Sequence, residues 1–484
     1  MQHFLSNKIF SSKAWIVLLS LPFLFSCASY NNKLSRYYGF LKHNNYSDAQ
    51  NALNNNRFLK QNRNELLRLM ELGKLNHLQG FYDSSNIYLN QADAFIESQR
   101  KSMGDFIKSG LVSPMAKNYL GEDFERFMIH YYKALNYLYL NQPDGARVEA
   151  RRITLSNNTL EDQFKPTSNK YKEDAFSLIV QGLVYESNGE SNNAFISYRN
   201  AVDLFLNAEN RIYYGVALPP TLLQDMYRSA YRSGFTDQIQ RYEKKTGIEF
   251  RNTETNEAGE LVLFIEKGMA PIKADQRFTL TNIGNGSFFF NGPFGGMNIP
   301  FDYGFAGWNT SRSISDFSII SVAIPVYTPQ NIHFESTKIM LNGQSYKSQL
   351  VHNISVLAPE ILRERMIKEV SAALVRAVIK KATQAVASAA AKTVAENSKS
   401  DSKDKKNHGE NVAAAAGLLV GLLNTATEKA DTRNWQSLPG IIQYIRIPLQ
   451  KGVNEITLQS FSNEKKITVN SNGGLQLRNW CLLR

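Results

Sequence analysis

Cysteine and histidine are scarce in this chain. Its 484 residues include two cysteines and seven histidines. Two cysteines cannot build a disulfide-rich scaffold, a four-cysteine zinc site or an iron–sulfur cluster, and the scattered histidines do not favour a histidine-rich metal site. We therefore expect no cofactor and no metal. Hydrophobic residues reach 43% and aromatic residues 11%, which excludes a disordered chain.

Long apolar runs are also missing. Residues 14–25 (AWIVLLSLPFLF) are apolar and follow the basic residues Lys8 and Lys13. A membrane-spanning helix needs about 20 apolar residues, whereas a shorter run after a basic segment is typical of a secretory signal peptide. We predict a lipoprotein signal peptide over residues 1–26.

The end of this run resembles a bacterial lipobox. Residues 24–27 read LFSC, so a small residue precedes a cysteine that can take up a diacylglyceryl group. We predict lipidation of Cys27; the alternative is an ordinary secretory signal with an incidental cysteine. Acyl chains such as palmitate contribute about 0.8 kcal/mol per buried CH₂, so several of them anchor a protein. By resemblance to lipoprotein sorting signals, the absence of aspartate after Cys27 predicts an outer-membrane lipoprotein facing the periplasm.

Residues 27–248 have helical periodicity, and one stretch has the spacing of a tetratricopeptide repeat. Short side chains would let paired helices approach closely, and tyrosines would fill the gap between them. A glycine between the helices would adopt positive φ and end the first one. The positions that carry this pattern are Gly182, Tyr185, Gly189, Ala194, Tyr198 and Ala201.

Weaker copies of the repeat begin at Gly73 and Ala134. Together with the best copy they reach the three units that a continuous core needs. We therefore predict an irregular, tetratricopeptide-like α-solenoid. Its concave face would bind a partner protein or peptide, through polar side chains such as Asn192 and Arg199.

Alternating apolar residues replace the helical period near residue 250. Residues 260–267 and 475–482 read as strands, and 346–356 reads as a single strand. The predicted fold is α+β and multidomain: the α-solenoid is followed by a β-rich domain that carries an Ala-rich helical hairpin. Whether the strands form a sandwich or a barrel stays open. The predicted boundaries of the β-rich domain are 249–356 and 431–484, with the hairpin at 357–430 and its flexible charged linker at 396–410.

The hairpin has one small-residue face on each helix. Such faces allow close helix contact, either within the hairpin, onto the β-rich domain, between copies of the chain or in lipid. We favour the first two and leave homo-oligomerisation and membrane insertion as alternatives. The residues concerned are Ala387, Ala391, Ala395, Ala413, Gly417 and Gly421.

The net charge is +12. Its densest lysine cluster, over 380–406, is interpreted as a solvated surface, with attraction to anionic headgroups or peptidoglycan carboxylates as the alternative. Nucleic acid is not an expected partner of an exported protein.

Six short stretches carry a further signal, at 119–130, 134–137, 146–152, 268–271, 324–327 and 430–439. The last reads Ala430-Asp-Thr-Arg433-Asn-Trp435 followed by Leu438-Pro439. Together these stretches resemble an uncharacterised family of bacterial tetratricopeptide-like lipoproteins. The resemblance implies a periplasmic lipoprotein with a helical front and a β-rich rear, and it brings no catalytic residue. It also associates such proteins with activators of peptidoglycan synthases.

Motifs for metalloproteases, P-loop enzymes, serine hydrolases and dinucleotide-binding folds are missing. We interpret Asp431 and Arg433 as a structural pair at a helix-to-strand junction, with Trp435 packed on the sheet; a catalytic or binding pair is the alternative. His130 is interpreted as a helix-packing residue. The run Phe288–Phe290 is interpreted as core, with a ligand platform as the alternative.

We therefore predict a protein that is not an enzyme: a lipid-anchored scaffold that binds an envelope protein. The alternative is a cell-wall regulator whose β-rich domain contacts a peptidoglycan synthase or peptidoglycan. An enzyme is the third possibility.

Overall fold

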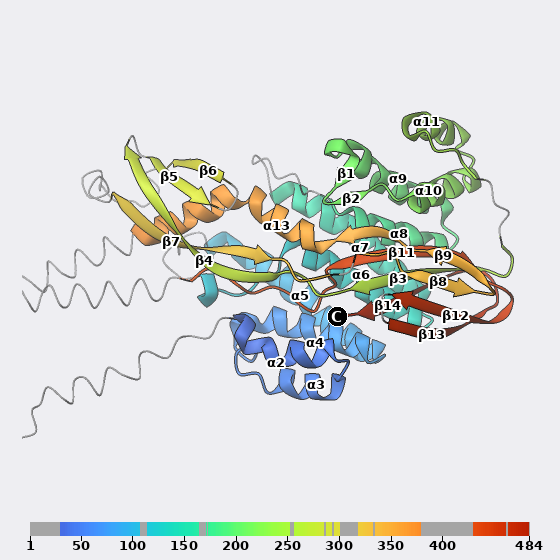
Figure 1. The fold of residues 1–484 in the computed structure, drawn as a ribbon, viewed down its shortest axis with the longest axis horizontal. Coiled ribbons are helices and arrows are strands. Elements are labelled where there is room, and N and C mark those ends of the chain that lie inside the picture. Colours follow the sequence, from blue (N-terminus) through green and yellow to red (C-terminus); the bar gives the residue numbers. More distant parts are fainter. Residues whose placement is uncertain are drawn as a thin grey trace, which may run out of the picture.

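The computed structural model describes the chain in ranges separated by gaps, namely residues 30–106, 114–163, 171, 173–251, 256–284, 287–292, 295–300, 318–332, 334–378, 429–460 and 463–483. Within these ranges the fold is mixed α+β. Helices fill the N-terminal half and several β-sheets fill the C-terminal half (Figure 1).

Several predicted features lie outside the described residues. These are the signal peptide, Cys27, both small-residue faces of the hairpin, its linker at 396–410 and the lysine cluster at 380–406. Among the described residues, no helix combines the length and the apolar character that crossing a bilayer requires.

The N-terminal half is a succession of antiparallel helix pairs in which each helix packs on the next. The helices are α2 (Tyr30–Lys42), α3 (Tyr46–Asn54), α4 (Glu65–Leu78), α5 (Tyr82–Phe106), α6 (Asp123–Tyr139), α7 (Pro143–Gln163), α8 (Ala175–Ser187), α9 (Ser191–Asn207), α10 (Pro220–Arg232) and α11 (Thr236–Thr246). Between α9 and α10 lies a two-stranded hairpin of β1 (Ile212–Tyr213) and β2 (Val216–Ala217).

Glycine allows close contact between α8 and α9. A Cβ atom added to Gly182 would lie 2.4 Å from a ring carbon of Tyr198, so only hydrogen fits there. Tyr198 is buried, and its hydroxyl donates a hydrogen bond to Glu186 at 2.8 Å. Gly189, at φ +77°, ends the α8 turn. Ala194 and Ala201, together with the larger Tyr185, are buried as well.

We expect Gly182→Ala to lower the free energy of unfolding by about 1–3 kcal/mol, because the methyl group would overpack the contact with Tyr198. The matched control is Gly39→Ala. Gly39 also lies within a helix, but a Cβ there meets nothing within 4 Å, so helix propensity alone should stabilise this variant by up to about 1 kcal/mol. Urea titrations measure both changes. Equal effects of the two substitutions would contradict the packing argument.

Three four-stranded sheets make up the C-terminal half. The central sheet has the order β10-β11-β3-β14, with β10 (Gln349–Asn353), β11 (Ile441–Pro448), β3 (Glu260–Lys267) and β14 (Leu475–Leu482). Only β14 runs parallel to its neighbour, with Leu475 opposite Glu260. The second sheet has the order β13-β12-β8-β9, with β13 (Asn463–Ser471), β12 (Gly452–Ser460), β8 (Lys338–Leu341) and β9 (Gln344–Lys347).

The third sheet has the order β6-β5-β4-β7 and extends away from the other two (Figure 1). Its strands are β4 (Ile272–Gly284), β5 (Ser287–Gly292), β6 (Gly295–Pro300) and β7 (Ile319–Thr328). Phe288 and Phe290 are buried in its core, where the helical residues Met366, Val370 and Leu374 pack against them. Phe289 points to the other face and is 40% exposed.

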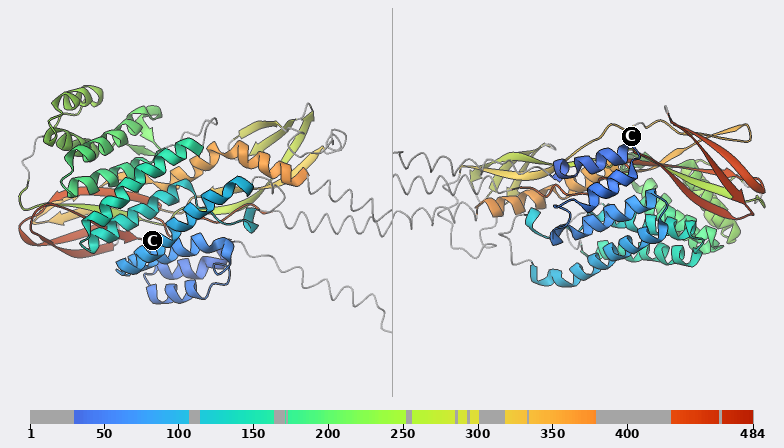
Figure 2. Two further views of the ribbon diagram at one scale, coloured as in Figure 1. Left: turned by 180° about the vertical axis from the view of Figure 1, so that it is seen from behind. Right: turned by 90° about the horizontal axis from the view of Figure 1, so that it is seen from below.

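The central sheet lies between the helices and the second sheet (Figure 2). On β3, Val262 and Phe264 belong to the core that is shared with the helices. Their neighbours Leu261 and Leu263 belong to the core between the two sheets. The strands therefore form a sandwich with helices on its outer face, and one continuous core joins the helical and β-rich parts of the chain.

The chain leaves the central sheet after β10 and returns to it as β11, the neighbouring strand. The stretch expected to be one strand over 346–356 is therefore divided among β9, β10 and the start of α13 (Ile354–Glu364). Asn353 causes the switch, because its side chain accepts the backbone N–H of Val356 and caps α13.

The inner face of the helix pairs is covered by the central sheet. Helices α4, α6, α8 and α10 face it, and α8 is buried at every position from Ala175 to Glu186. Asn192 and Arg199, the predicted partner-binding residues, lie instead on α9 in the outer helix layer. Within the described residues, the face expected to bind a partner is thus covered by the chain's own strands.

Candidate functional site

A buried arginine on β11 joins the helices to the central sheet. Arg446 contacts Glu186 of α8 at 2.5 Å, Asp225 of α10 at 3.0 Å and Glu260 of β3 at 2.7 Å. The nearby hydroxyl of Tyr444 lies 3.4 Å from Asp225. Because every one of these charges contacts an opposite charge inside the protein, this cluster holds the layers together.

The Asp431–Arg433–Trp435 segment forms a second junction. Arg433 is fully buried, pairs with Asp431 at 2.6 Å and donates to the backbone carbonyl oxygens of Arg63, Pro114 and Lys117. Trp435 is also fully buried, and its backbone N–H donates to Glu125 of α6 at 2.6 Å. The donors of Arg433 are therefore used in holding loops of the helical half against the segment that leads into β11.

His130 belongs to a third buried cluster. Potential metal-ligand atoms of Asp93, His130 and Glu149 lie within 4.8 Å of one another. However, the ammonium of Lys133 donates to Asp93 at 3.1 Å and to Glu149 at 3.0 Å, and Arg152 also contacts Asp93. The Nδ1 atom of His130 lies 2.8 Å from Glu149. Two cations thus already balance the charge of these carboxylates, so the residues form an ion-pair cluster between helices.

The fourth cluster centres on Glu266 of β3. The carboxylate accepts hydrogen bonds from five side chains, namely Lys74 at 2.6 Å, Tyr131 at 3.0 Å, Tyr132 at 2.8 Å, Asn479 at 2.6 Å and Cys481 at 3.0 Å. Burial alone would raise the pKa of Glu266, but the Lys74 ammonium and the hydrogen bonds outweigh it and lower the pKa to about 2.

Cys481 and His77 both contact the amide of Asn479 but do not form a reactive pair. Burial and the carboxylate of Glu266 raise the pKa of the Cys481 thiol far above its usual range. Burial and the charge of Lys74 lower the pKa of His77 to about 4. At neutral pH the thiol is thus protonated and the imidazole neutral, whereas a cysteine nucleophile requires a thiolate.

We expect Cys481 to react with a neutral-pH thiol reagent at least about 100-fold more slowly than an unstructured cysteine, because so little thiolate is present. The measurement uses Cys27→Ser, in which Cys481 is the only remaining thiol, with the same chain in urea as the reference. Equal rates in the native and unfolded states would contradict the protonated, enclosed thiol.

A groove opens beside this cluster, between β13, β14 and the helices. Its cavity is about 340 Å³. Tyr82 and Tyr139 stack with ring centres 4.3 Å apart, and the Arg478 guanidinium lies 4.9 Å from the Tyr139 ring centre. Lys465 adds a second cation. Among the described residues that line the groove there is no carboxylate.

Both strands that border the groove are the last strands of their sheets. Three backbone groups on these edges are bonded by side chains instead of by a neighbouring strand. The N–H of Asn479 donates to the Tyr139 hydroxyl at 3.0 Å. The carbonyl of Leu477 accepts from Arg478 at 3.0 Å, and that of Asn470 accepts from the Gln476 amide at 2.8 Å.

No protein-family model matches this chain. No curated protein and no solved structure matches it either. The resemblance to bacterial tetratricopeptide-like lipoproteins therefore stays a prediction, and the function has to be argued from the geometry of the chain itself.

Sequence reasoning did not find the groove. Its residues come from α3, α4, α5, α6, β3, β13 and β14, which are spread over most of the chain. No local motif marks such a set. The one available signal is that Lys465, Lys466 and Arg478 place cations on the last two strands, as exposed edge strands often do.

Proposed function

We propose that the protein is a non-enzymatic lipoprotein of the outer membrane, anchored through Cys27 and facing the periplasm. It acts as a tetratricopeptide-like scaffold that holds an extended segment of an envelope protein in the groove between β13 and β14. The observation that carries this proposal is the meeting of two sheet edges, at β13 and β14, on either side of one cavity.

An extended peptide can add to a sheet edge by pairing with its free backbone groups. On β14, alternate residues point their backbone groups to the same side, so the backbone groups of Leu477, Asn479 and Cys481 lie on the edge that faces away from β3. The side chains of Arg478 and Tyr139 now occupy two of these groups. A peptide backbone supplies the same donors and acceptors and can replace them without leaving either group unpaired.

The charges of the groove favour an acidic segment. Lys465 and Arg478 line it without a carboxylate among the described lining residues. An aspartate or glutamate of the partner would pair with the guanidinium, which the ring of Tyr139 already holds in place. Charge-assisted hydrogen bonds of this kind are the stronger class. Elsewhere in the described chain, the buried carboxylates of Glu186 and Glu266 take part in ion pairs between the helices and the central sheet. The buried carboxylates of Glu71 and Glu125 instead accept hydrogen bonds from tyrosine hydroxyls.

Photocrosslinking in intact cells tests the peptide site. A photoreactive residue at Thr468, which is exposed on β13 beside the groove, should capture one specific envelope protein. The same residue at Arg241, exposed on α11 away from the groove, serves as the control. Tyr139→Phe combined with Arg478→Ala removes one hydroxyl and the guanidinium that line the groove. Because the partner's carboxylate then loses its cation, the Thr468 crosslink yield should fall by about tenfold or more. Equal capture from both positions would overturn the site.

Purified sacculi separate the proposal from its rival, a cell-wall regulator that contacts peptidoglycan directly. Binding of the full chain to sacculi, lost on Arg478→Ala, would favour the rival.

Fractionation of a Cys27→Ala variant tests the anchor, because this variant should leave the membrane fraction for the soluble periplasm.

A further inference from the structure

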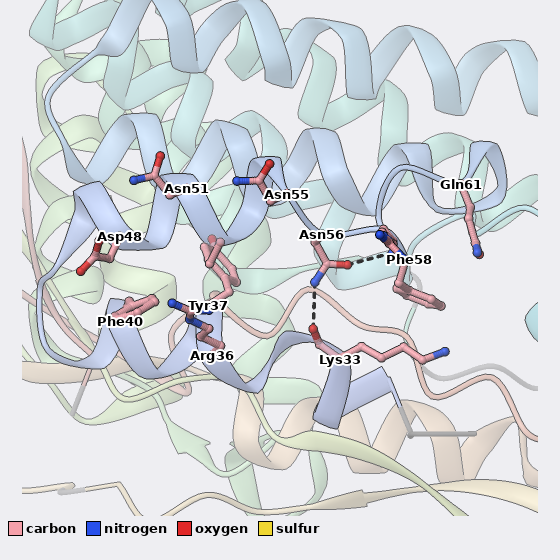
Figure 3. A pocket seen from close by; sticks show the side chains of 12 residues that line it. Lys33, Arg36, Tyr37, Phe40, Asp48, Asn51, Asn55, Asn56, Phe58 and Gln61 are labelled. Carbon is pink, nitrogen blue, oxygen red and sulfur yellow. Dashed lines mark hydrogen bonds between the residues drawn. The ribbon is translucent and has the colours of Figure 1, made fainter. Parts of the chain in front are cut away.

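The first two described helices, α2 and α3, enclose a second and larger groove (Figure 3). Its cavity is about 600 Å³. Lys33 and Arg36 of α2 lie on one side. Asn51 of α3 and Asn55, which follows the last residue of α3, lie on the other. The amide of Asn56 donates to the backbone carbonyl of Lys33 at 2.8 Å and bridges the two sides (Figure 3).

Three cations line this groove: Lys33, Arg36 and Arg57. All three are exposed, and no carboxylate of the described residues forms an ion pair with any of them. Aromatic rings support two of them. The ammonium of Lys33 lies 4.7 Å from the ring centre of Phe58, and the guanidinium of Arg36 lies 5.5 Å from that of Phe40.

The remaining polar groups are mostly neutral amides. Asn51, Asn55 and Gln61 place side-chain amides along the groove, and these can donate hydrogen bonds to an oxyanion. Asp48 is the single carboxylate among the described lining residues, and it accepts a hydrogen bond from Asn45 at 2.8 Å. Cations without partners, beside neutral donors, suit a phosphate group.

The position of the groove indicates where that phosphate comes from. Only Ala28 and Ser29 separate Cys27 from Tyr30, the first residue of α2. Consecutive Cα atoms are about 3.8 Å apart, so Tyr30 lies within about 11 Å of the Cα atom of Cys27. If Cys27 carries acyl chains, as in the proposed function, α2 lies at the surface of the bilayer.

We propose that the α2–α3 groove binds the phosphate of an anionic lipid headgroup. The lipid anchor would keep the groove at high effective concentration near headgroups, so a weak intrinsic affinity suffices. The groove would then fix the orientation of the body on the membrane. This inference uses the proposed anchor to choose the lipid as the source of the phosphate, but the binding itself does not depend on lipidation.

The experiment uses the full chain with Cys27→Ser, which has no acyl chain. Binding is measured by cosedimentation with vesicles of phosphatidylcholine alone, and with vesicles that contain phosphatidylcholine and phosphatidylglycerol in equal amounts. The protein with the wild-type groove residues should bind the anionic vesicles more tightly than the vesicles of phosphatidylcholine alone. Each cation near an anionic surface contributes about fivefold to binding, so Lys33→Glu with Arg36→Glu should weaken it by about 25-fold or more.

The matched control is Arg241→Glu with Lys244→Glu. These residues are exposed on α11 at the same spacing of three and change the net charge equally. An equal loss in both double variants would overturn the site, because the attraction would then come from overall charge. Binding of inorganic phosphate as tight as binding to anionic vesicles would overturn the lipid as its source. A failure of membrane anchoring through Cys27 leaves this measurement unchanged, so the two proposals fail separately.

Discussion

Replacing Glu266 with glutamine is expected to lower the free energy of unfolding by about 3–5 kcal/mol at neutral pH. Glu266 and Lys74 are both fully buried, and the substitution leaves the Lys74 ammonium without its counter-charge. Tyr131, Tyr132 and Asn479 also lose a charged acceptor. The cost therefore comes mainly from an unpaired charge in the core.

Urea titrations of the wild type and of Glu266→Gln measure this effect. The exposed Glu455→Gln is the control, with an expected change within about 0.5 kcal/mol. The double variant Lys74→Met with Glu266→Leu removes both charges, so it should be more stable than Glu266→Gln by about 1–2 kcal/mol. A double variant no more stable than the single one would contradict the unpaired-charge explanation.

The effect of Glu266→Gln also depends on pH. The pKa of Glu266 is about 2 in the folded protein, below the value of about 4.3 for an unperturbed glutamate. Its contribution to stability is therefore complete above about pH 4.3 and is lost as the pH falls through 2. The difference between the wild type and the variant should shrink over that interval.

Replacing Arg446 with methionine is expected to cost about 3–5 kcal/mol at pH 8. This arginine is the charge partner that Glu186, Asp225 and Glu260 share on β11. Without it, Glu186 and Asp225 stay buried with only Arg228 and Arg232, on α10, as the remaining cations in contact with them. Helices α8 and α10 would lose their strongest connection to the central sheet.

Lowering the pH should partly restore the stability of the Arg446→Met variant. Burial already raises the pKa of Asp225 to about 6 although Arg446 lies beside it, and removing the arginine raises that pKa further. A carboxyl whose folded pKa is raised stabilises the protein below its unfolded pKa and loses that contribution as the pH rises through the folded pKa. The deficit should thus be smaller at pH 5 than at pH 8. Thermal melts at both values check this, with the exposed Arg241→Met as the control. A deficit independent of pH would show that lost packing, not charge, causes it.

The two clusters have a common consequence for the groove at β14. Glu266 contacts helices α4 and α6, and Arg446 contacts helices α8 and α10. Both residues therefore tie the central sheet to the helices, and β14 borders the groove as a strand of that sheet. A partner that binds there would meet a preformed surface, which lowers the entropic cost of association.

Local pattern in the sequence determined many of the elements. The alternating runs at 260–267 and 475–482 are β3 and β14, because a pleated strand places successive side chains on opposite faces. The spacing from Gly182 to Ala201 predicted a close helix pair, which α8 and α9 form, because short side chains decide how near two helices can come. Both kinds of signal come from residues that lie close together in the sequence.

Only the tertiary structure decided what covers the inner helix face and where a groove opens. Lys74, Glu266 and Arg446 are charged and look like surface residues in the sequence, yet they are buried because their partners come from distant parts of the chain. Asn192 and Arg199 instead stay at least partly exposed on α9, because the central sheet covers the opposite face of the helix pairs. Periodicity reports which side of an element is apolar, but it does not say which other element packs there.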